Sequence, residues 1–327
     1  MIKVAFDDWW EGFDKTNNFI TKTLQGNIDY RIVDNPKEAD FLFCSIEKKK
    51  FYNYKCPRIL FTGENYVPNF NFYDYAIGFE HMSFADRYFR YPLYVAYYDE
   101  ACKLIENKKE LSGNECDRNF CSFVVSNSAA DSYRVRLFDN LSKYKDISSG
   151  GKFRNNIGIP EGVPNKIEFL KNYKFNIACE NVSHPGYCTE KIIEAFAAIT
   201  VPIYWGDPRI CEYFNPKAFI NCNEFDSIDS VIEHIIKVDK DDDLYMSMLN
   251  EPIIISERYS FNKMRDDFKT WLVSIVSQEK SYAYRRDFSG YSYRMEEEYI
   301  KFNKMKERKK KSVLKEIFNN KVIKTHE

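Results

Sequence analysis

The chain has 327 residues, enough for about two domains that each bury a core of their own. A hydrophobic content of 44% and an aromatic content of 17% exclude an intrinsically disordered protein. With 48 basic and 49 acidic residues the formal net charge is −1, so the overall charge favours neither a polyanionic nor a polycationic partner.

The first part of the chain alternates short apolar runs with a helical pattern. Strands are predicted over Ile2–Phe6, Ala39–Cys44 and Ile59–Thr62, and a helix over Asp14–Leu24. This alternation predicts a parallel sheet with crossover helices. The polar stretch Asp99–Arg118 then predicts a linker between domains. No apolar run of signal-peptide type opens the sequence, and no window is long and apolar enough to span a bilayer.

A second α/β block follows this linker and ends near Gln278. Its predicted strands are Phe120–Ser126, Phe175–Cys179, Val201–Trp205 and Ala218–Asn221, and its predicted helices are Ser132–Leu141, Lys166–Tyr173, Glu190–Ala198 and Ser227–Val238. The sequence therefore predicts an N-terminal α/β domain over residues 1–117, a C-terminal α/β domain over residues 118–278 and a tail over residues 279–327.

The stretch from Phe175 to Gly206 predicts a strand, a glycine-containing loop, a helix and a second strand. In an open α/β sheet, ligands bind beside the carboxyl ends of the strands. The helix opens on Thr189, Glu190 and Lys191. A helix start carries unpaired N–H groups and a partial positive charge, to which Lys191 adds a full one. This combination predicts a ligand that carries a phosphate.

The cysteines and the acidic runs favour neither a disulfide framework nor a metal site. The nine cysteines are scattered, odd in number and form no CxxC pair, which indicates small buried hydrophobes in a reducing compartment. Cys188 lies in the glycine-containing loop, where we expect it to pack and not to react. The runs Asp7–Asp8 and Asp241–Asp243 lack the setting of a metal-binding DxD motif and are expected to be helix caps or solvated turns.

The tail carries the basic run KMKERKKK followed by VLKEIFNNKVI. Its apolar residues recur at helical spacing: Val313, Leu314, Ile317, Phe318 and Val322. A basic amphipathic helix over residues 299–323 can lie on an anionic membrane surface. The alternative is a helix that packs its apolar stripe on the protein body, and the sequence leaves both readings open.

Several segments stand out together: Phe61–Asn65 with the following VPNFNFYDYAIGF, Ser126–Asn127, Arg134–Arg136, Glu180–Lys191 and Pro202–Gly206. Together they resemble the α1,3/4-fucosyltransferase family, and among its members the bacterial, cytosolic ones. The resemblance extends over roughly Ile2 to Trp271. It implies a GT-B architecture, with two Rossmann-like domains facing a cleft. The acceptor side would be N-terminal and the nucleotide-sugar side C-terminal.

Members of this family transfer L-fucose from GDP-fucose to a hydroxyl of N-acetylglucosamine or glucose, with inversion at the anomeric carbon. Such a transfer needs a base that removes the acceptor proton. Glu64 matches the family position of that base. Without the resemblance, a carboxylate in a loop would be read as solvated or capping. Phe61 and Tyr66 lie beside Glu64 in the sequence, and burial by such neighbours raises the pKa of a carboxyl group.

The leaving group of this transfer is a diphosphate, whose growing charge needs neutralising. Arg134 and Lys191 match the two cations of the family that bind the diphosphate, since Arg gives bidentate contacts and Lys a point charge. We therefore expect no metal cofactor. Arg136 lies two residues beyond Arg134 and faces elsewhere on a helix.

Further positions match residues that contact the nucleotide sugar in the family, namely Asn181, Tyr187 and Glu190. An acidic residue in the first turn of a helix is also favourable without any ligand, so the residue type of Glu190 has a second explanation. His184 is expected either to be solvated or to touch the diphosphate. Pro185 stiffens the loop and leaves its path open.

The sequence thus predicts a GDP-fucose-dependent α1,3-fucosyltransferase. The expected acceptor is a glycan of N-acetyllactosamine type in a surface polysaccharide or lipopolysaccharide, as in Lewis-type structures. The expected location is the cytoplasm, or the inner face of the plasma membrane if the tail binds the membrane. No nucleic-acid partner is expected. Two alternatives remain: a GT-B enzyme that uses another nucleotide sugar, and an inactive glycan-binding relative. The choice between α1,3 and α1,4 linkage, the acceptor and the oligomeric state stay open.

Overall fold

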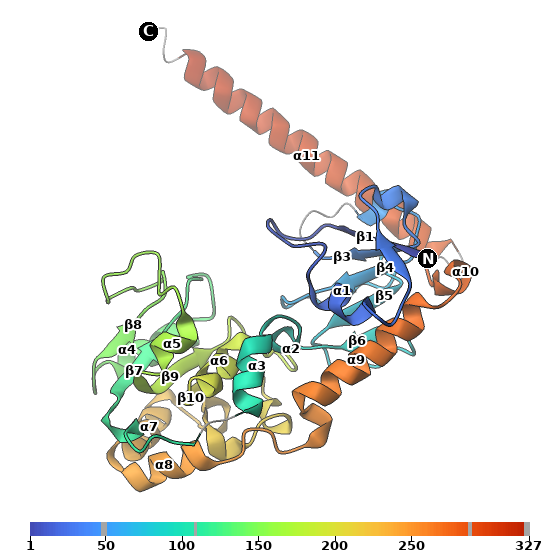
Figure 1. Cartoon of the computed structure of the whole chain (residues 1–327). Coiled ribbons are helices and arrows are strands. Elements are labelled where there is room, and N and C mark those ends of the chain that lie inside the picture. The colour runs from blue at the N-terminus through green and yellow to red at the C-terminus, as the bar shows by residue number, and fades with distance from the viewer. Residues whose placement is uncertain (47–50, 108–109, 287–289, 324–327) are drawn as a thin grey trace.

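The computed structural model describes residues 1–46, 51–107, 110–286 and 290–323, but no side chain of residue 307 or of residues 310–323. In the described part, two parallel sheets with flanking helices form two α/β domains, and a long helix ends the chain (Figure 1). The predicted fold class is confirmed.

The first sheet comprises β1 (Ile2–Asp7), β2 (Tyr30–Ile32), β3 (Phe41–Cys44), β4 (Arg58–Phe61), β5 (Tyr75–Gly78) and β6 (Tyr88–Arg90). Its strand order is β2-β1-β3-β4-β5-β6, with every neighbouring pair parallel. Every residue of β3, β4 and β5 is buried, as expected for strands covered on both faces. The carboxyl ends of these strands form one edge of the domain.

The first helix, α1 (Phe19–Leu24), begins later than the predicted Asp14. Asn18 caps it: the side chain accepts from the backbone N–H groups of Ile20 and Thr21, and Thr21 Oγ1 accepts from the N–H of Asn18 in return. This capping box fixes the start of the helix. The residues before Asn18 form a turn instead, in which the Asp14 carboxylate accepts from the N–H of Thr16.

The predicted linker from Asp99 is wrong over its first half. After α2 (Leu93–Tyr97), the chain forms α3 (Asp99–Glu106), which buries Ala101, Cys102 and Ile105. These apolar residues recur at helical spacing, but the charged residues between them dominate the composition. Helix α3 packs against α6 (Glu190–Ala197) of the second domain. The polar stretch therefore joins the domains through a packed helix.

The second sheet comprises β7 (Asn119–Phe123), β8 (Ile147–Ser149), β9 (Tyr173–Cys179), β10 (Val201–Trp205) and β11 (Ile220–Asn221). Besides α6, the domain contains α4 (Ser132–Leu141), α5 (Lys166–Leu170), α7 (Ile228–Lys240) and α8 (Asp242–Asn250). The order is β11-β10-β9-β7-β8, again all parallel. The direction of winding reverses between β7 and β9, and a crevice at such a reversal is a usual ligand site.

Most predicted bounds in this domain shift by a few residues. The predicted strand over Phe120–Ser126 ends at Phe123, and the following residues leave the sheet as a loop. The strand predicted from Ala218 begins at Ile220, because Pro216–Ala218 forms a 3₁₀ turn. Asp241 caps α8 by accepting from the N–H of Leu244, so one acidic run is a helix cap as expected.

After the second domain the chain returns to the first one. Helix α9 (Phe261–Val276) packs against α1, with the ring of Phe268 stacked on Tyr91 at a centroid distance of 4.2 Å. A short helix, α10 (Lys280–Ala283), follows. The domain boundaries therefore stay a prediction, since α9 lies within the range assigned to the second domain but contacts the first.

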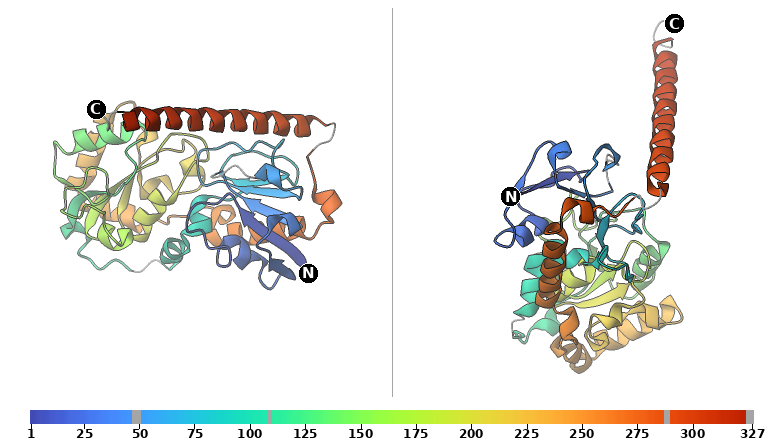
Figure 2. Two further views of the ribbon diagram at one scale, coloured as in Figure 1. Left: turned by 90° about the horizontal axis from the view of Figure 1, so that it is seen from above. Right: turned by 90° about the vertical axis from the view of Figure 1, so that its right-hand side faces the viewer.

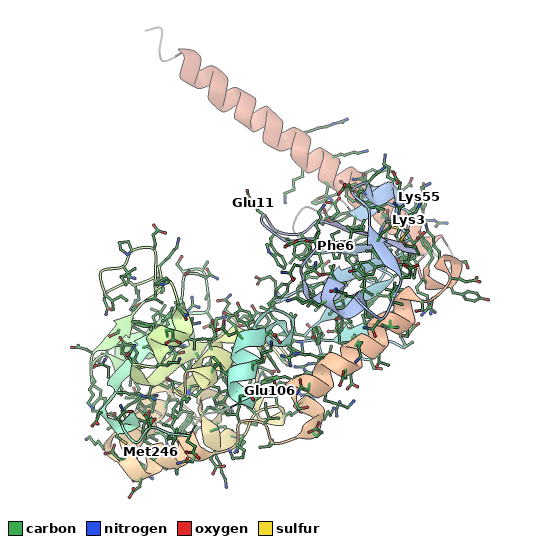
Figure 3. The ribbon with its side chains drawn as sticks, viewed as in Figure 1. Lys3, Phe6, Glu11, Lys55, Glu106 and Met246 are labelled. Carbon is green, nitrogen blue, oxygen red and sulfur yellow. The ribbon has the colours of Figure 1, made fainter. Side chains whose placement is uncertain are left out.

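The buried hydrophobic residues hold the two domains together. One core cluster contains Phe6 of β1 together with Ile192 of α6, so it extends from one domain into the other. A second cluster lies within the C-terminal domain, with Met246 packed at its border. Figure 3 labels Phe6 and Met246 in these two regions. The nine cysteines are all free, and burial raises the pKa of the Cys188 thiol, which packs in the first cluster.

The tail is helical, as predicted, but its helix, α11 (Tyr291–Ile323), begins before the predicted residue 299. Its first turns dock on the first domain: Glu296 pairs with the buried Arg58 through bonds of 2.8 and 3.0 Å, and Tyr299 packs on Phe72. The helix then projects from the body (Figure 1, and the right-hand view of Figure 2). The apolar residues predicted to form its stripe are among those whose side chains the structure does not describe: Val313, Leu314, Ile317, Phe318 and Val322. No helix in the described part of the chain combines the length and hydropathy needed to cross a membrane.

Candidate functional site

The loops after the strands of both domains meet at one place. His184 Nε2 lies 2.9 Å from Glu80 Oε1, and the ring of Tyr187 packs edge-on against Phe79 at a centroid distance of 5.0 Å. Gly186 has a φ of +88°, and a Cβ there would lie 2.4 Å from the carbonyl oxygen of Phe79, so this contact requires glycine. The glycine-containing loop thus docks on the first domain, and His184 has a carboxylate partner there.

A cavity of about 360 Å³ lies beside this loop, at the reversal between β7 and β9 and at the N-terminus of α6. We call it the α6 cavity. It is lined by Tyr98, Val124, Val125, Ser126, Asn127, Arg134, Val163, Lys166, Asn181, Glu190, Lys191 and Glu194. Four residues predicted from the sequence therefore share one cavity: Arg134, Asn181, Glu190 and Lys191.

Arg134 lies in the first turn of α4, which begins where the Asp131 carboxylate accepts from the N–H of Tyr133. The residue is only 1% exposed. One terminal nitrogen donates to Asn181 Oδ1 at 3.2 Å, and the other donates to the carbonyl oxygen of Asn127. The Nε atom is buried and has no hydrogen-bond partner among the described residues. A buried donor without a partner costs stability, so the guanidinium is arranged for a ligand.

The ammonium group of Lys191 pairs with a buried carboxylate, Glu180, which does not itself line the cavity. Glu180 follows β9 and is fully buried, and its two oxygens accept from Thr189 N at 2.7 Å, Thr189 Oγ1 at 2.6 Å and Lys191 Nζ at 3.0 Å. Glu190 Oε1 lies 3.3 Å from the same ammonium. Thr189 is the N-cap residue of α6, yet its hydroxyl bonds Glu180 and caps no helix N–H. Glu180 therefore positions both Lys191 and the start of the helix.

These charges shift one another's pKa values. Burial alone would lower the pKa of Lys191, but the charges of Glu180 and Glu190 outweigh burial and raise it. Burial alone would raise the pKa of Glu190, yet the charges of Lys191 and Lys166 lower it to about 2. The ammonium and the carboxylate at the helix start are therefore both charged at neutral pH.

Glu180 is absent from the functional residues predicted from the sequence. It stands against Gly206 after β10, where a Cβ would lie 2.5 Å from Glu180 Cγ. A carboxylate directly after a buried strand is the one signal for it in the sequence. That signal does not say which cation the carboxylate meets, because Thr189 and Lys191 come back to Glu180 only through the path of the loop.

Among the polar residues that line the cavity, Tyr98, Lys166 and Glu194 also escaped prediction. Tyr98 directly precedes the stretch that was predicted to be a linker. Burial, together with the charges of Glu190 and Glu194, raises the pKa of its hydroxyl, which stays protonated. Lys166 opens α5, and its Nζ lies 2.5 Å from Oε2 of Glu194, one turn along α6 from Glu190. The ion pair between α5 and α6 explains Lys166 and Glu194 without a ligand.

Glu64 lies outside the α6 cavity, at the carboxyl end of β4 in the other domain. Its side chain is exposed, and its backbone N–H donates to Thr62 Oγ1 at 3.2 Å. Tyr187 lies close enough to Glu64 to feel its charge: burial raises the pKa of Tyr187, and the charges of Glu180 and Glu64 raise it further. Arg136 is exposed on the outer side of α4, as expected.

The arrangement combines an anion site with hydrogen-bonding groups. Arg134 and Lys191 flank the N-terminus of α6, where the helix dipole and the free N–H groups favour a negative ligand. The carboxylates of Glu190 and Glu194 line the same cavity, and carboxylate oxygens can accept hydrogen bonds from hydroxyl groups. A phosphate joined to a sugar satisfies both parts.

Comparison with known proteins gives a consistent result. Residues 4–97 match the family model of the alpha-(1,3)-fucosyltransferase FucT N-terminal domain, and residues 115–251 match that of the C-terminal part of glycosyltransferase family 10 (fucosyltransferase). The chain is 33% identical to the alpha-(1,3)-fucosyltransferase FucT of Helicobacter pylori, over 88% of this chain and 70% of that protein. It is 27% identical to a putative fucosyltransferase of Acanthamoeba polyphaga mimivirus, over 77% of this chain and 43% of that one.

A solved structure agrees with these relatives. The crystal structure of an alpha1,3-fucosyltransferase with GDP-fucose superposes with a TM-score of 0.70 at 33% sequence identity, over 83% of this chain and 90% of the other. The crystal structure of an alpha1,3-fucosyltransferase with GDP superposes with a TM-score of 0.69. The GT-B architecture expected from the sequence is thereby confirmed.

Proposed function

The chain belongs to the fucosyltransferases of glycosyltransferase family 10, and from this premise we propose that it transfers L-fucose from GDP-fucose to an N-acetylglucosamine or glucose hydroxyl in α1,3 linkage. The observation that carries the proposal is the α6 cavity. There the buried Arg134 has an unpaired Nε, and Lys191 stands at the start of a helix. Both are matched to a diphosphate by charge and by donor geometry.

The residues divide the reaction between the two domains. Glu64 takes the proton of the acceptor hydroxyl as its oxygen attacks the anomeric carbon of fucose. The bond from that carbon to the β-phosphate oxygen breaks on the opposite face, so the configuration inverts and GDP leaves. Arg134 and Lys191 neutralise the charge that grows on GDP, which requires no metal ion. Asn181, Tyr187 and Glu190 hold the nucleotide sugar.

The proposed acceptor is a glycan of N-acetyllactosamine type at the end of a surface polysaccharide or lipopolysaccharide. Glu64 stands on the exposed edge of the N-terminal domain, so an extended glycan can reach it. The proposed place of action is the cytoplasmic side of the membrane on which such glycans are assembled.

Thermal unfolding with nucleotides tests the donor part of this function. A ligand that binds only the folded protein stabilises it, by about 2.7 kcal/mol at 100 times its Kd. We expect GDP and GDP-fucose to raise the Tm, UDP and UDP-sugars to leave it unchanged, and the GDP effect to persist in EDTA. Stabilisation by UDP-sugars without GDP, or a GDP effect that EDTA abolishes and Mn²⁺ restores, would contradict the proposal.

The projecting part of α11 is proposed to bind an anionic membrane surface. Exposed Phe302 and Met305 stand among basic residues there, and each Lys or Arg near such a surface contributes about 1 kcal/mol. We expect the full chain to sediment with vesicles containing phosphatidylglycerol, and a chain ending at Lys301 to stay in solution while retaining fucose transfer. A full chain that ignores these vesicles at low salt would refute this role.

A further inference from the structure

The wall of the α6 cavity holds a carboxylate that the mechanism above does not use. Glu194 lies on α6 one helical turn after Glu190, and its side chain is 11% exposed. Its one ion-pair partner among the described residues is Lys166. A carboxylate offers about four lone-pair positions, so a single ammonium leaves acceptor capacity directed at a ligand.

The axis of α6 sets the order in which a ligand meets these groups. Lys191 stands in the first turn, and Glu194 follows three residues later, about 4.5 Å further along the axis at 1.5 Å per residue. In a nucleoside diphosphate the ribose is attached directly to the phosphates, and the base lies beyond it. In GDP-fucose the diphosphate carries the ribose on one side and the fucose on the other. The fucose has to face Glu64 of the first domain, on which the loop before α6 docks through Tyr187 and Gly186. With the phosphates at Lys191, the group that extends along α6 to Glu194 is therefore the ribose.

The rest of the cavity lining suits the guanine ring of the nucleotide. Val124, Val125 and Val163 line the cavity and present apolar side chains, which favour a flat aromatic ring over a polyhydroxylated sugar. The carboxylate of Glu194, in contrast, matches a vicinal diol, since its two oxygens can each accept one hydroxyl proton. Hydrogen bonds to a charged acceptor are among the strong ones in proteins.

We propose that Glu194 accepts hydrogen bonds from the 2′- and 3′-hydroxyls of the donor ribose, and that Lys166 positions its carboxylate for this contact. The proposal rests on the proposed function, because it takes the ligand of the α6 cavity to be a nucleoside diphosphate. It makes Glu194 the residue that selects a ribonucleotide over a deoxyribonucleotide.

Calorimetric titration of the full chain with GDP, 2′-deoxy-GDP and 3′-deoxy-GDP tests this role. We expect the wild-type protein to bind GDP at least about tenfold more tightly than either deoxynucleotide, the size of a hydrogen bond to a charged group. In Glu194→Gln we expect GDP affinity to fall by about the same factor and the preference for GDP to approach one. The expected signature is thus a lost preference and not merely a weaker affinity.

Two further variants separate binding from folding. Glu168→Gln is the matched control, because Glu168 is an exposed carboxylate on the neighbouring α5, paired with Lys171 at 2.6 Å and outside the cavity lining. It is expected to retain wild-type GDP affinity and preference. The double variant Lys166→Gln/Glu194→Gln leaves no unpaired charge, so it keeps the test valid where the single variant is unstable. It is expected to lose the preference as well.

Several results would overturn the proposal. One is a wild-type protein that binds both deoxynucleotides as tightly as GDP, and another is a Glu194→Gln variant whose preference is intact. A third is a Glu194→Gln variant that keeps the ribose preference but binds GDP and inosine diphosphate, which lacks the 2-amino group, equally well. That result would place Glu194 beside the guanine ring instead of the ribose. A wild-type protein that binds UDP and not GDP would overturn the proposed function itself, a result distinct from the other three.

Discussion

Glu64→Gln is expected to lower kcat by about 10²- to 10⁴-fold, the usual contribution of a positioned general base. The amide has nearly the shape of the carboxylate but cannot take the proton of the acceptor hydroxyl. Because Glu64 lies outside the α6 cavity, in the other domain, the Kd for GDP is expected to stay unchanged. Steady-state kinetics with GDP titration measures both quantities on one preparation.

The matched control is Glu11→Gln. Glu11 is also an exposed carboxylate in the loop that follows a strand at the same edge of the first sheet, here β1. It has no part in the proposed reaction, so its kcat is expected to equal that of the wild type. A Glu64→Gln variant with wild-type turnover would remove Glu64 from the role of base, and equal losses in both variants would indicate a general electrostatic effect.

Lys191→Met is expected to have two separate effects. Loss of a charged hydrogen bond to phosphate weakens GDP binding by about 1.5–3 kcal/mol. Loss of the partner of the fully buried Glu180 also destabilises the fold, by about 3–5 kcal/mol for a broken buried ion pair. Calorimetric titration and denaturant unfolding measure the two effects independently.

The double variant Glu180→Gln/Lys191→Met distinguishes them. Without the buried charge it is expected to regain most of the lost stability, yet to bind GDP no better than Lys191→Met. Wild-type GDP affinity in Lys191→Met would refute the phosphate contact. A double variant as unstable as the single one would show that Glu180 does not depend on Lys191 for its charge compensation.

The sequence pattern alone predicted a phosphate site at the strand end and the helix start beside Lys191. Arg134 and Lys191 lie 57 positions apart in the chain, and the structure brings both into the α6 cavity. Lys191 was predicted from its place at a helix start after a parallel strand, whereas Arg134 followed only from the resemblance to the family. Their contact with a diphosphate stays a prediction.

What escaped prediction depends on contacts between distant segments. Glu180 reads as one more polar residue after a strand, and only the folded loop brings it to Lys191. Tyr98 directly precedes a stretch whose charges obscured the apolar face of α3. Gly186 reads as an ordinary loop glycine, and only the structure shows its close approach to Phe79 in the other domain. Composition and spacing along the chain do not encode which loops of two domains will meet.

The most direct test of the central claim is the product formed from GDP-fucose. The full chain is incubated with GDP-fucose and equal amounts of type 1 and type 2 disaccharides, and the linkage is assigned by NMR. We expect one GDP released per fucose transferred, and α-linked fucose on O3 of the N-acetylglucosamine in the type 2 disaccharide. GDP-fucose left intact with every acceptor, or a β-linked product, would contradict an inverting transfer with Glu64 as the base and the donor in the α6 cavity.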